Sequence, residues 1–103
     1  MENKYKLIIF PSAQNDMEQI FKYISKNLHN PSAANKQIND FEESLDNVCR
    51  FPNSFPYVNN EYVKDKSIHK LIVNNYIVFY RRENKEVQVV RVLFSMRDYN
   101  KII

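Results

Sequence analysis

The stretch SIHKLIVNNYIVFYRRENKEVQVVRVLFSMRDY, residues Ser67–Tyr99, decides the fold of this chain. It contains three segments rich in Ile, Val, Phe and Tyr, which suit a pleated, half-buried surface. The predicted strands are Ser67–Val73, Tyr76–Arg82 and Glu86–Ser95. Asn74-Asn75 and Asn84-Lys85 separate them, and in a chain without glycine Asn best tolerates the positive φ of a tight turn. The stretch therefore predicts an antiparallel meander.

Two-residue turns would fix the register of this meander. Val73 then pairs with Tyr76, Ile72 with Ile77, and Arg82 with Val87. One face collects His69, Leu71, Val73, Tyr76, Val78, Tyr80, Val89, Arg91 and Leu93. The other collects Ile68, Lys70, Ile72, Ile77, Phe79, Arg81, Val90, Val92 and Phe94. Because neither face is polar, we expect both to be covered.

The N-terminal half predicts one strand and two helices. Tyr5–Phe10 is a short strand before Pro11, and Ser12 is a plausible N-cap for a helix that reaches about Leu28. A second helix follows Asn30-Pro31, capped by Ser32. The two apolar stripes are Met17, Ile20, Phe21, Ile24, Leu28 and Ala34, Ile38, Phe41, Leu45, Val48. A loop over Phe51–Asp65 leads into the meander.

This element order predicts an α+β fold in a single domain, residues 1–103. An N-terminal strand and an antiparallel two-helix hairpin would pack on a mainly antiparallel sheet of about four strands. One hairpin covers only one sheet face, so an apolar face is left over. Such a patch on a soluble monomer marks a protein partner, unless the C-terminal Tyr99–Ile103 folds back over part of it.

Composition narrows the class of protein. With 44% hydrophobic and 26% charged residues, the chain is globular rather than disordered. A single Cys49 excludes an internal disulfide and a cysteine-rich zinc site, and it fits a reducing compartment. The apolar run Leu7–Phe10 is too short for a signal peptide, and no run approaches the roughly 20 residues of a membrane span. We therefore expect a cytoplasmic protein.

Charge is unevenly distributed along the chain. Residues 64–103 carry a net charge of +5 and residues 1–63 a net charge of −2. This polarity favours a polyanion or an acidic protein partner, although scattered solubilising charge on sheet edges gives the same count. The absence of glycine rules out a glycine-rich phosphate loop. No His, Cys or carboxylate spacing predicts a metal site, and no cofactor is expected.

A basic and aromatic set remains: Lys70, Arg81, Arg82, Arg91, Arg97, Tyr80 and Tyr99. Such residues could activate a 2′-hydroxyl, stabilise charge on phosphorus and protonate a leaving oxygen in metal-free RNA cleavage. His69 could carry a proton among these cations, or it could be a strand histidine bonded locally. The same cations could also simply be solvated or pair with carboxylates such as Glu83 and Asp98.

The order of elements and several phrases resemble the RelE/ParE family of toxins from bacterial type II toxin–antitoxin modules. The phrases are NPSAA at Asn30–Ala34, FP at Phe51-Pro52, NNYIVFY at Asn74–Tyr80 and VVRVLFSMRDY at Val89–Tyr99. The resemblance covers nearly the whole chain. It implies a growth-inhibiting, plasmid-stabilising toxin without a cofactor, neutralised by a cognate antitoxin. RelE-like members cleave mRNA on the ribosome, whereas ParE-like members inhibit DNA gyrase.

Three positions depart from the RelE-like nuclease pattern. Ile77 stands where the nucleases have an arginine, His69 replaces the arginine of the preceding phrase, and Phe94 stands where many relatives have a histidine. Lys70 matches a position that is often basic, and Arg97 matches the family's RD dipeptide. The departures favour a ParE-like toxin that binds DNA gyrase.

The resemblance also divides the two sheet faces between core and partner. The family's cationic positions fall on the face of Lys70, so we expect the helices to cover the face of Leu71, Tyr76, Val78 and Leu93. The expected partner-binding residues on the other face are Ile68, Ile72, Ile77, Phe79 and Phe94. In the alternative, a ribosome-dependent mRNA endonuclease, the catalytic candidates are Lys70, Arg81, Arg97, Tyr99 and His69. A binding module that retains only antitoxin affinity is a third reading.

Overall fold

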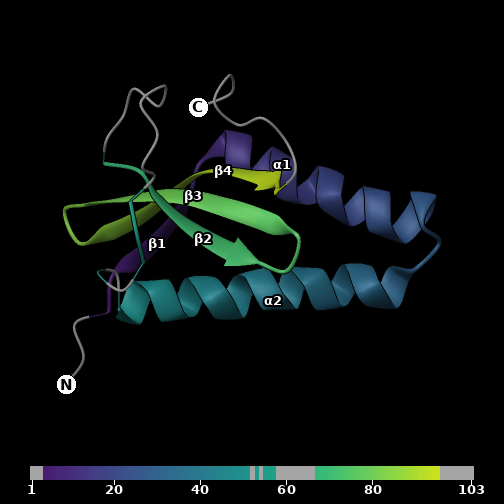
Figure 1. Ribbon diagram of the computed structural model, residues 1–103, viewed down its shortest axis with the longest axis horizontal. Coiled ribbons are helices and arrows are strands. Elements are labelled where there is room, and N and C mark those ends of the chain that lie inside the picture. Colours follow the sequence, from purple (N-terminus) through teal and green to yellow (C-terminus); the bar gives the residue numbers. More distant parts are fainter. Residues whose placement is uncertain (1–3, 52, 54, 58–66, 96–103) are drawn as a thin grey trace.

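The computed structural model describes residues 4–51, 53, 55–57 and 67–95. Strand β1 (Lys6–Ile9) leads into helix α1 (Pro11–Lys22), a π-helical turn η1 (Tyr23–Asn27) and helix α2 (Pro31–Arg50). Strands β2 (His69–Val73), β3 (Tyr76–Glu83) and β4 (Glu86–Phe94) form the meander. The predicted α+β fold, with its first strand, helical hairpin and four-stranded sheet, is confirmed (Figure 1).

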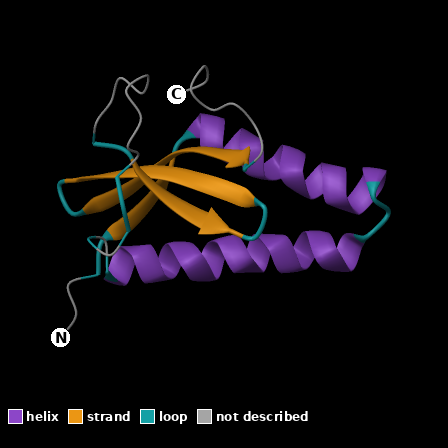
Figure 2. Cartoon of the chain, viewed as in Figure 1, coloured by secondary structure: helices purple, strands orange, loops and turns teal. Residues whose placement is uncertain are grey.

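The sheet has the strand order β1-β4-β3-β2, so β1 and β2 form its two edges (Figure 2). The three strands of the meander pair antiparallel, and β1 pairs parallel to β4. Both hairpins have the predicted two-residue turns: φ is 58° at Asn74, 52° at Asn84 and 61° at Lys85. The predicted pairs Val73 with Tyr76 and Arg82 with Val87 are confirmed.

Prolines start both helices, because a missing N–H costs nothing in the first helical turn. The N-cap of α1 is Phe10, which makes no side-chain cap bond, so the predicted cap at Ser12 is wrong. The N-cap of α2 is Asn30, whose side-chain oxygen accepts the N–H of Ala33 at 3.1 Å. The expected cap at Ser32 therefore lies two residues too late.

Both helices pack on the same face of the sheet. Helix α1 contributes Ala13 and Met17 to this core, and α2 contributes Phe41, Leu45 and Val48. The buried sheet residues that they meet are Leu71, Val73, Tyr76, Val78, Tyr80, Val87, Val89 and Val92. The expected covered face is thus right along β2 and β3.

A β-bulge in β4 overturns the face assignment of that strand's last residues. Tyr80 pairs with Val89 but Phe79 pairs with Arg91, so Val90 is an extra residue without a partner position. Because side chains alternate with a period of two, one inserted residue moves all later side chains to the opposite face. Val92 therefore faces the helices, and the prediction that Leu93 does so is wrong.

The second sheet face carries a smaller apolar cluster of Ile68, Ile77, Phe79 and Leu93, with Val90 packed against it. Ile68, Ile77 and Phe79 expose only 2%, 7% and 0% of their surface. The expectation of an open apolar face is therefore wrong at these three positions. Ile72 is 64% exposed and stands out from this face. Phe94, 47% exposed, pairs with Tyr76 and lies on the helix side instead, beyond the bulge.

Helix α1 also covers the edge of β4 beyond the end of β1 (Figure 1). Asp16 of α1 accepts hydrogen bonds from Nε and Nη2 of Arg91 at 2.7 and 2.9 Å. The backbone N–H of Val92 donates to the same carboxylate at 2.9 Å. Asp16 thus bonds the edge of β4 where no neighbouring strand does so. Its hydrogen bond also raises the pKa of the Arg91 guanidinium.

Candidate functional site

His69 lies away from the other catalytic candidates. It belongs to β2, on the helix-covered face, and is 3% exposed. Its ring stacks between those of Tyr57 and Tyr80, with centroids 3.9 and 5.0 Å away. Nδ1 is 2.9 Å from the carbonyl oxygen of Phe55, so it donates to that oxygen. His69 thus joins the segment 55–57 to the sheet.

Burial in this stack raises the pKa of the Tyr80 phenol to about 12. A proton leaves such a group only far above neutral pH. Segment 55–57 is held further by an isolated bridge between Tyr57 and His69 and by the N–H of Lys70, which donates to the oxygen of Pro56. The stacked rings of Tyr57, His69 and Tyr80 therefore attach the segment 55–57 to the sheet.

Lys70 and Arg81 lie on the opposite face from His69. Lys70 is partly exposed and sits beside Phe79 across the β2–β3 pair. Arg81 donates from Nε to the side-chain oxygen of Gln88 at 2.8 Å, and its guanidinium lies 5.7 Å from the centre of the Phe10 ring. The structure therefore places Lys70 and Arg81 on one face of the sheet and His69 on the other.

Arg97 and Tyr99, the other two catalytic candidates, lie outside the described residues. Among residues 4–51, 53, 55–57 and 67–95, no group of three or more His, Cys, Asp or Glu side chains could hold a metal ion.

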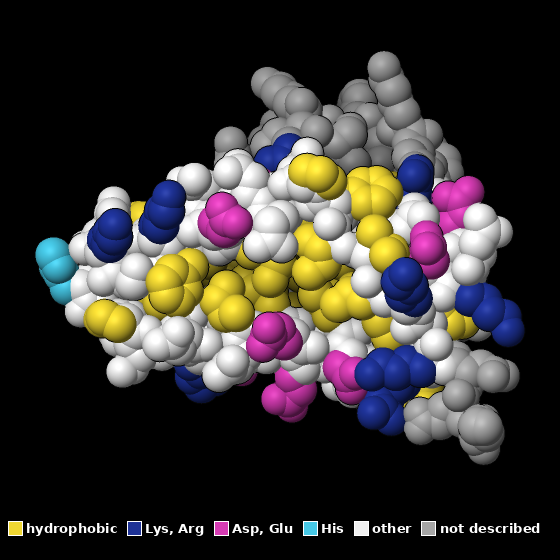
Figure 3. All heavy atoms as spheres, turned by 180° about the vertical axis from the view of Figure 1, so that it is seen from behind, with side chains coloured by type: hydrophobic (Ala, Val, Ile, Leu, Met, Phe, Trp, Pro, Cys, Tyr) yellow, Lys and Arg dark blue, Asp and Glu magenta, His cyan; other side chains and the backbone are white. Residues whose placement is uncertain are grey.

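A groove lies between α1 and α2, with β1 at its base. It has a volume of about 750 Å³. Its apolar lining comes from all three elements: Tyr5, Leu7, Ile9, Met17, Phe21, Ile38, Leu45 and Cys49. Figure 3 shows this apolar hollow along the back of the molecule, with charged side chains beside it. Leu7 is 38% exposed there.

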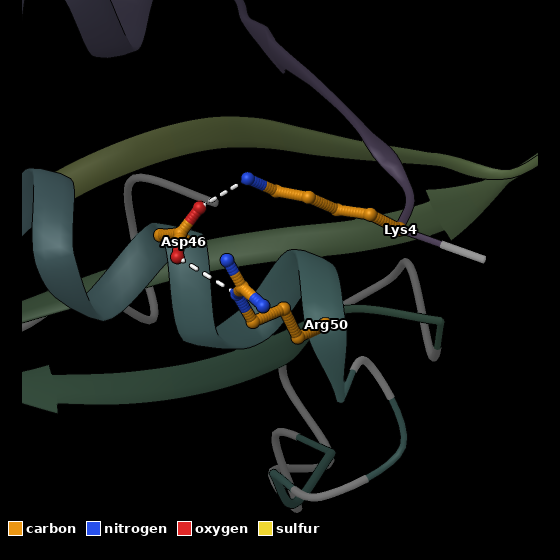
Figure 4. Close-up of polar contacts among 3 residues, drawn as sticks. All are labelled: Lys4, Asp46 and Arg50. Atoms are coloured by element: carbon orange, nitrogen blue, oxygen red, sulfur yellow. Dashed lines mark hydrogen bonds and ion pairs between the residues drawn. The ribbon is translucent and has the colours of Figure 1, made fainter. Parts of the chain in front are cut away.

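Acidic side chains outnumber basic ones on the groove's lining: Glu18, Glu42 and Asp46 against Lys4 and Lys22. One end is closed by Asp46, which forms ion pairs with both Lys4 and Arg50 (Figure 4). Lys4 first, and Arg50 second, hold the pKa of Asp46 below its ordinary value of 3.8. Nearby, burial raises the pKa of the Cys49 thiol.

A second, smaller cleft of about 390 Å³ lies where α1 and η1 meet the end of β4. Tyr23, Tyr76 and Phe94 contribute aromatic surface to it, and the rings of Tyr76 and Phe94 meet edge to face at 5.9 Å. Of the five expected partner-binding residues, Phe94 is thus placed beside a cleft rather than on the second sheet face.

Sequence reasoning missed the groove residues. Phe21 and Ile38 belong to the two helical stripes that the sequence identified, and both are only partly buried and line the groove. The strand Lys6–Ile9, with three apolar residues in a row, was the sequence signal for the groove. In the structure half of the residues of this strand are exposed to solvent. How far two amphipathic helices separate is set by the sheet beneath them, and no local pattern encodes it.

Comparisons with known proteins agree with this fold. A family model described as "ParE toxin of type II toxin-antitoxin system, parDE" matches residues 7–99. A structure of the chromosomal ParDE toxin–antitoxin system from P. aeruginosa is similar with a TM-score of 0.73 and 20% identity, covering 90% of this chain and 98% of that one. The toxin–antitoxin complex RelBE2 from Mycobacterium tuberculosis follows with a TM-score of 0.60 and 15% identity, covering 88% and 98%.

No curated protein sequence matches this chain significantly. Within the part of the chain that the structure describes, neither helix is both long and apolar enough to cross a membrane.

Proposed function

Because the chain belongs to the ParE toxin family of type II toxin–antitoxin systems, we propose that it inhibits DNA gyrase by binding it and that a cognate antitoxin neutralises it. The family match over residues 7–99 carries this proposal. The toxin would act in the cytoplasm, where gyrase works, and inhibition by binding would need no cofactor.

The placement of the basic residues supports inhibition by binding over RNA cleavage. A general base and the cations that stabilise a phosphorane must lie within hydrogen-bond reach of one substrate. His69 is buried on the helix side, whereas Lys70 and Arg81 lie on the other face. Arg81 is already held by Gln88. The described residues therefore supply no complete acid–base set.

The second candidate is a ribosome-dependent mRNA endonuclease of the RelE type. Lys70 and Arg81 sharing one sheet face is the observation that favours it. In this case both cations would contact the phosphate backbone of the message, and Lys70→Ala would lower cleavage.

The five residues that we expect to contact the antitoxin differ in how exposed their side chains are. Ile72 and Phe94 are exposed, on opposite faces of the sheet, and are the two of the five that a partner could reach directly. We expect Ile72→Ala or Phe94→Ala to weaken antitoxin binding more than the same change at Phe51. Phe51 is 61% exposed and lies outside the sheet, so it is a matched control.

One pair of assays tests the function. Purified toxin is added to a DNA supercoiling reaction with gyrase, and message 5′ ends are mapped after induced expression in bacteria with and without the adjacent gene. Inhibited supercoiling, uncut message and rescue by the adjacent gene support the proposal. Unchanged supercoiling with new 5′ ends that disappear in Lys70→Ala would establish the endonuclease instead.

A further inference from the structure

The cleft of about 390 Å³ at the end of β4 is lined by three aromatic side chains from three different elements. Tyr23 comes from η1, Tyr76 from the first position of β3 and Phe94 from the last position of β4, which lies beside α1 (Figure 1). Tyr23 and Phe94 are 51% and 47% exposed, so a partner can reach both. We call this feature the aromatic cleft. None of its described lining residues also lines the groove between α1 and α2.

One wall of the aromatic cleft is fixed before any partner binds. The ring of Tyr76 meets the ring of Phe41 at 5.8 Å and that of Phe94 at 5.9 Å, near edge to face in both pairs. Burial first, and the phenol of Tyr23 second, raise the pKa of Tyr76, so this phenol is uncharged at neutral pH. The rings of Tyr76 and Phe94 stand at 69° to each other. They therefore form adjacent walls of a cleft rather than one flat patch.

The charge of the lining disfavours an anion. The described residues that line the aromatic cleft include Asp16 and Gln19, but no Lys, Arg or His. Arg91 already balances the charge of Asp16 through two hydrogen bonds, from its Nε and Nη2. The attraction for a cation must therefore come chiefly from the aromatic faces, which carry a negative electrostatic potential.

Two kinds of group remain as occupants, an uncharged apolar side chain and a cationic one. Both gain from burial against Ile20 and the three rings. A cation gains the cation–π attraction in addition, and a guanidinium is favoured over an ammonium because its planar group also stacks on aromatic rings. A volume of about 390 Å³ is near the lower end of the range for binding pockets, so it suits one long side chain rather than a segment of chain.

We propose that the aromatic cleft holds the guanidinium of an Arg side chain of gyrase, against the rings of Tyr23 and Phe94. Tyr and Arg are the residue types that most often dominate protein interfaces, which fits one Arg as the anchor of this contact. The inference rests on the proposed function for the identity of the partner. Because we also expect Phe94 among the antitoxin contacts, an antitoxin that covers Phe94 would block the aromatic cleft as well.

Substitutions at the two exposed rings separate aromatic from merely apolar contact. Phe94→Leu and Tyr23→Leu keep an apolar side chain and remove the ring, whereas Phe94→Tyr and Tyr23→Phe keep a ring. The matched control is Phe51→Leu, since Phe51 is 61% exposed and does not line the cleft. Circular dichroism verifies that each variant is folded.

The readout is the toxin concentration that halves the rate of DNA supercoiling by purified gyrase. We expect each Leu variant at the cleft to need roughly 5- to 30-fold more toxin, and the aromatic variants and Phe51→Leu less than about twofold more. Equal inhibition by the Leu and aromatic variants would overturn the inference while leaving the proposed function standing. Loss of antitoxin binding without loss of inhibition would overturn it too.

A small probe tests the cleft without gyrase. N-acetyl-arginine amide and N-acetyl-citrulline amide have nearly the same shape, but only the first is charged. In NMR titrations of the wild-type toxin, we expect the arginine probe to shift the ring signals of Tyr23 and Phe94 with an affinity about 2- to 5-fold above that of citrulline, while Phe51 stays unchanged. Equal affinities, or no shift at Tyr23 and Phe94, would overturn the inference even if the toxin inhibits gyrase.

The same titration distinguishes the remaining outcomes. If the arginine probe binds but wild-type toxin does not inhibit gyrase, the proposed function and the partner fail and the guanidinium site stands. Arg97 follows Phe94 by three residues in the sequence, so Arg97→Ala is titrated as well. A probe that binds only to Arg97→Ala would assign the aromatic cleft to the chain's own arginine and overturn the gyrase contact.

Discussion

Asp16 joins the first helix to the last strand, and its removal should strongly destabilise the fold. The carboxylate is 12% exposed and accepts three hydrogen bonds, two from Arg91 and one from the N–H of Val92. Asp16→Ala would leave a partly buried guanidinium and a strand N–H without this partner. Truncating one partner of a buried pair costs about 3–5 kcal/mol.

The side chain of Arg91 is 27% exposed, so water replaces part of the lost contact. We therefore expect a loss of about 2–3 kcal/mol in the free energy of unfolding. For a domain of this size that loss lowers the melting temperature by roughly 10–20 °C. Asp16→Asn keeps an acceptor for the N–H of Val92 and should lose less than Asp16→Ala.

Urea denaturation followed by circular dichroism measures these losses. The matched control is Arg50→Ala, which breaks a more exposed ion pair with Asp46 at 3.0 Å and should cost much less than Asp16→Ala, because water screens exposed charges. A double-mutant cycle of Asp16→Ala with Arg91→Ala should give a coupling of about 1–2 kcal/mol. If Asp16→Ala is no more destabilising than Arg50→Ala, the carboxylate does not stabilise the edge of β4.

Three further predictions concern the turns and the second sheet face. In urea denaturation, Asn74→Ala should lower the free energy of unfolding by about 2–3 kcal/mol and Asn74→Gly by about 1 kcal/mol. Both variants lose the side-chain hydrogen bonds to α2, but only alanine is strained at a φ of 58°. Equal losses for the two variants would contradict this. The hydrogen bond from Asn74, and after it the one from Lys36, lowers the pKa of the Asp40 carboxyl below its ordinary value of 3.8. The stability that ionised Asp40 contributes is therefore fully present above pH 3.8 and is lost as the pH falls through the lower pKa of the folded state. Asp40→Asn should flatten the acid limb of the stability curve, and identical acid limbs would refute the linkage. Phe79→Ala should lower the free energy of unfolding by about 3–5 kcal/mol and Ile72→Ala by less than about 1 kcal/mol, because Phe79 is fully buried and Ile72 is 64% exposed. Similar urea midpoints for the two variants would show that the second sheet face is not part of the core.

Local chemistry made much of the fold predictable. Asn74 and Asn84 marked both turns, because in a chain without glycine Asn is the residue that best tolerates a positive φ. Proline at positions 11 and 31 marked the start of each helix. The register near each turn then followed by counting, since a two-residue hairpin admits only one pairing.

The bulge at Val90 was the point where counting failed, although the sequence contained a signal. Strict alternation places Arg91 among the core residues, which is a costly position for a charge. The inserted Val90 removes this conflict: Arg91 moves to the opposite face and reaches Asp16, and Val92 takes the core position. A charged residue that falls on an apolar face by counting is thus evidence for a bulge upstream.

The candidate site was less predictable, because it depends on contacts between distant segments. The sequence already predicted His69 and Lys70 on opposite faces of the sheet, but it did not show that Tyr57 stacks on His69, which is buried, while Lys70 stays partly exposed. The groove has no local signature at all, since it requires β1 to lie at the sheet edge and both helices to flank it.

The sequence by itself determined the elements, their order, the turns and the family, because periodicity, proline, asparagine and recurring phrases act over a few residues. Only the tertiary structure decided which apolar residues are core and which remain accessible. Ile77 and Ile72 have the same chemistry and share a face, but one is 7% and the other 64% exposed. Burial is a property of what packs on a side chain, and that is fixed by segments far away in the sequence.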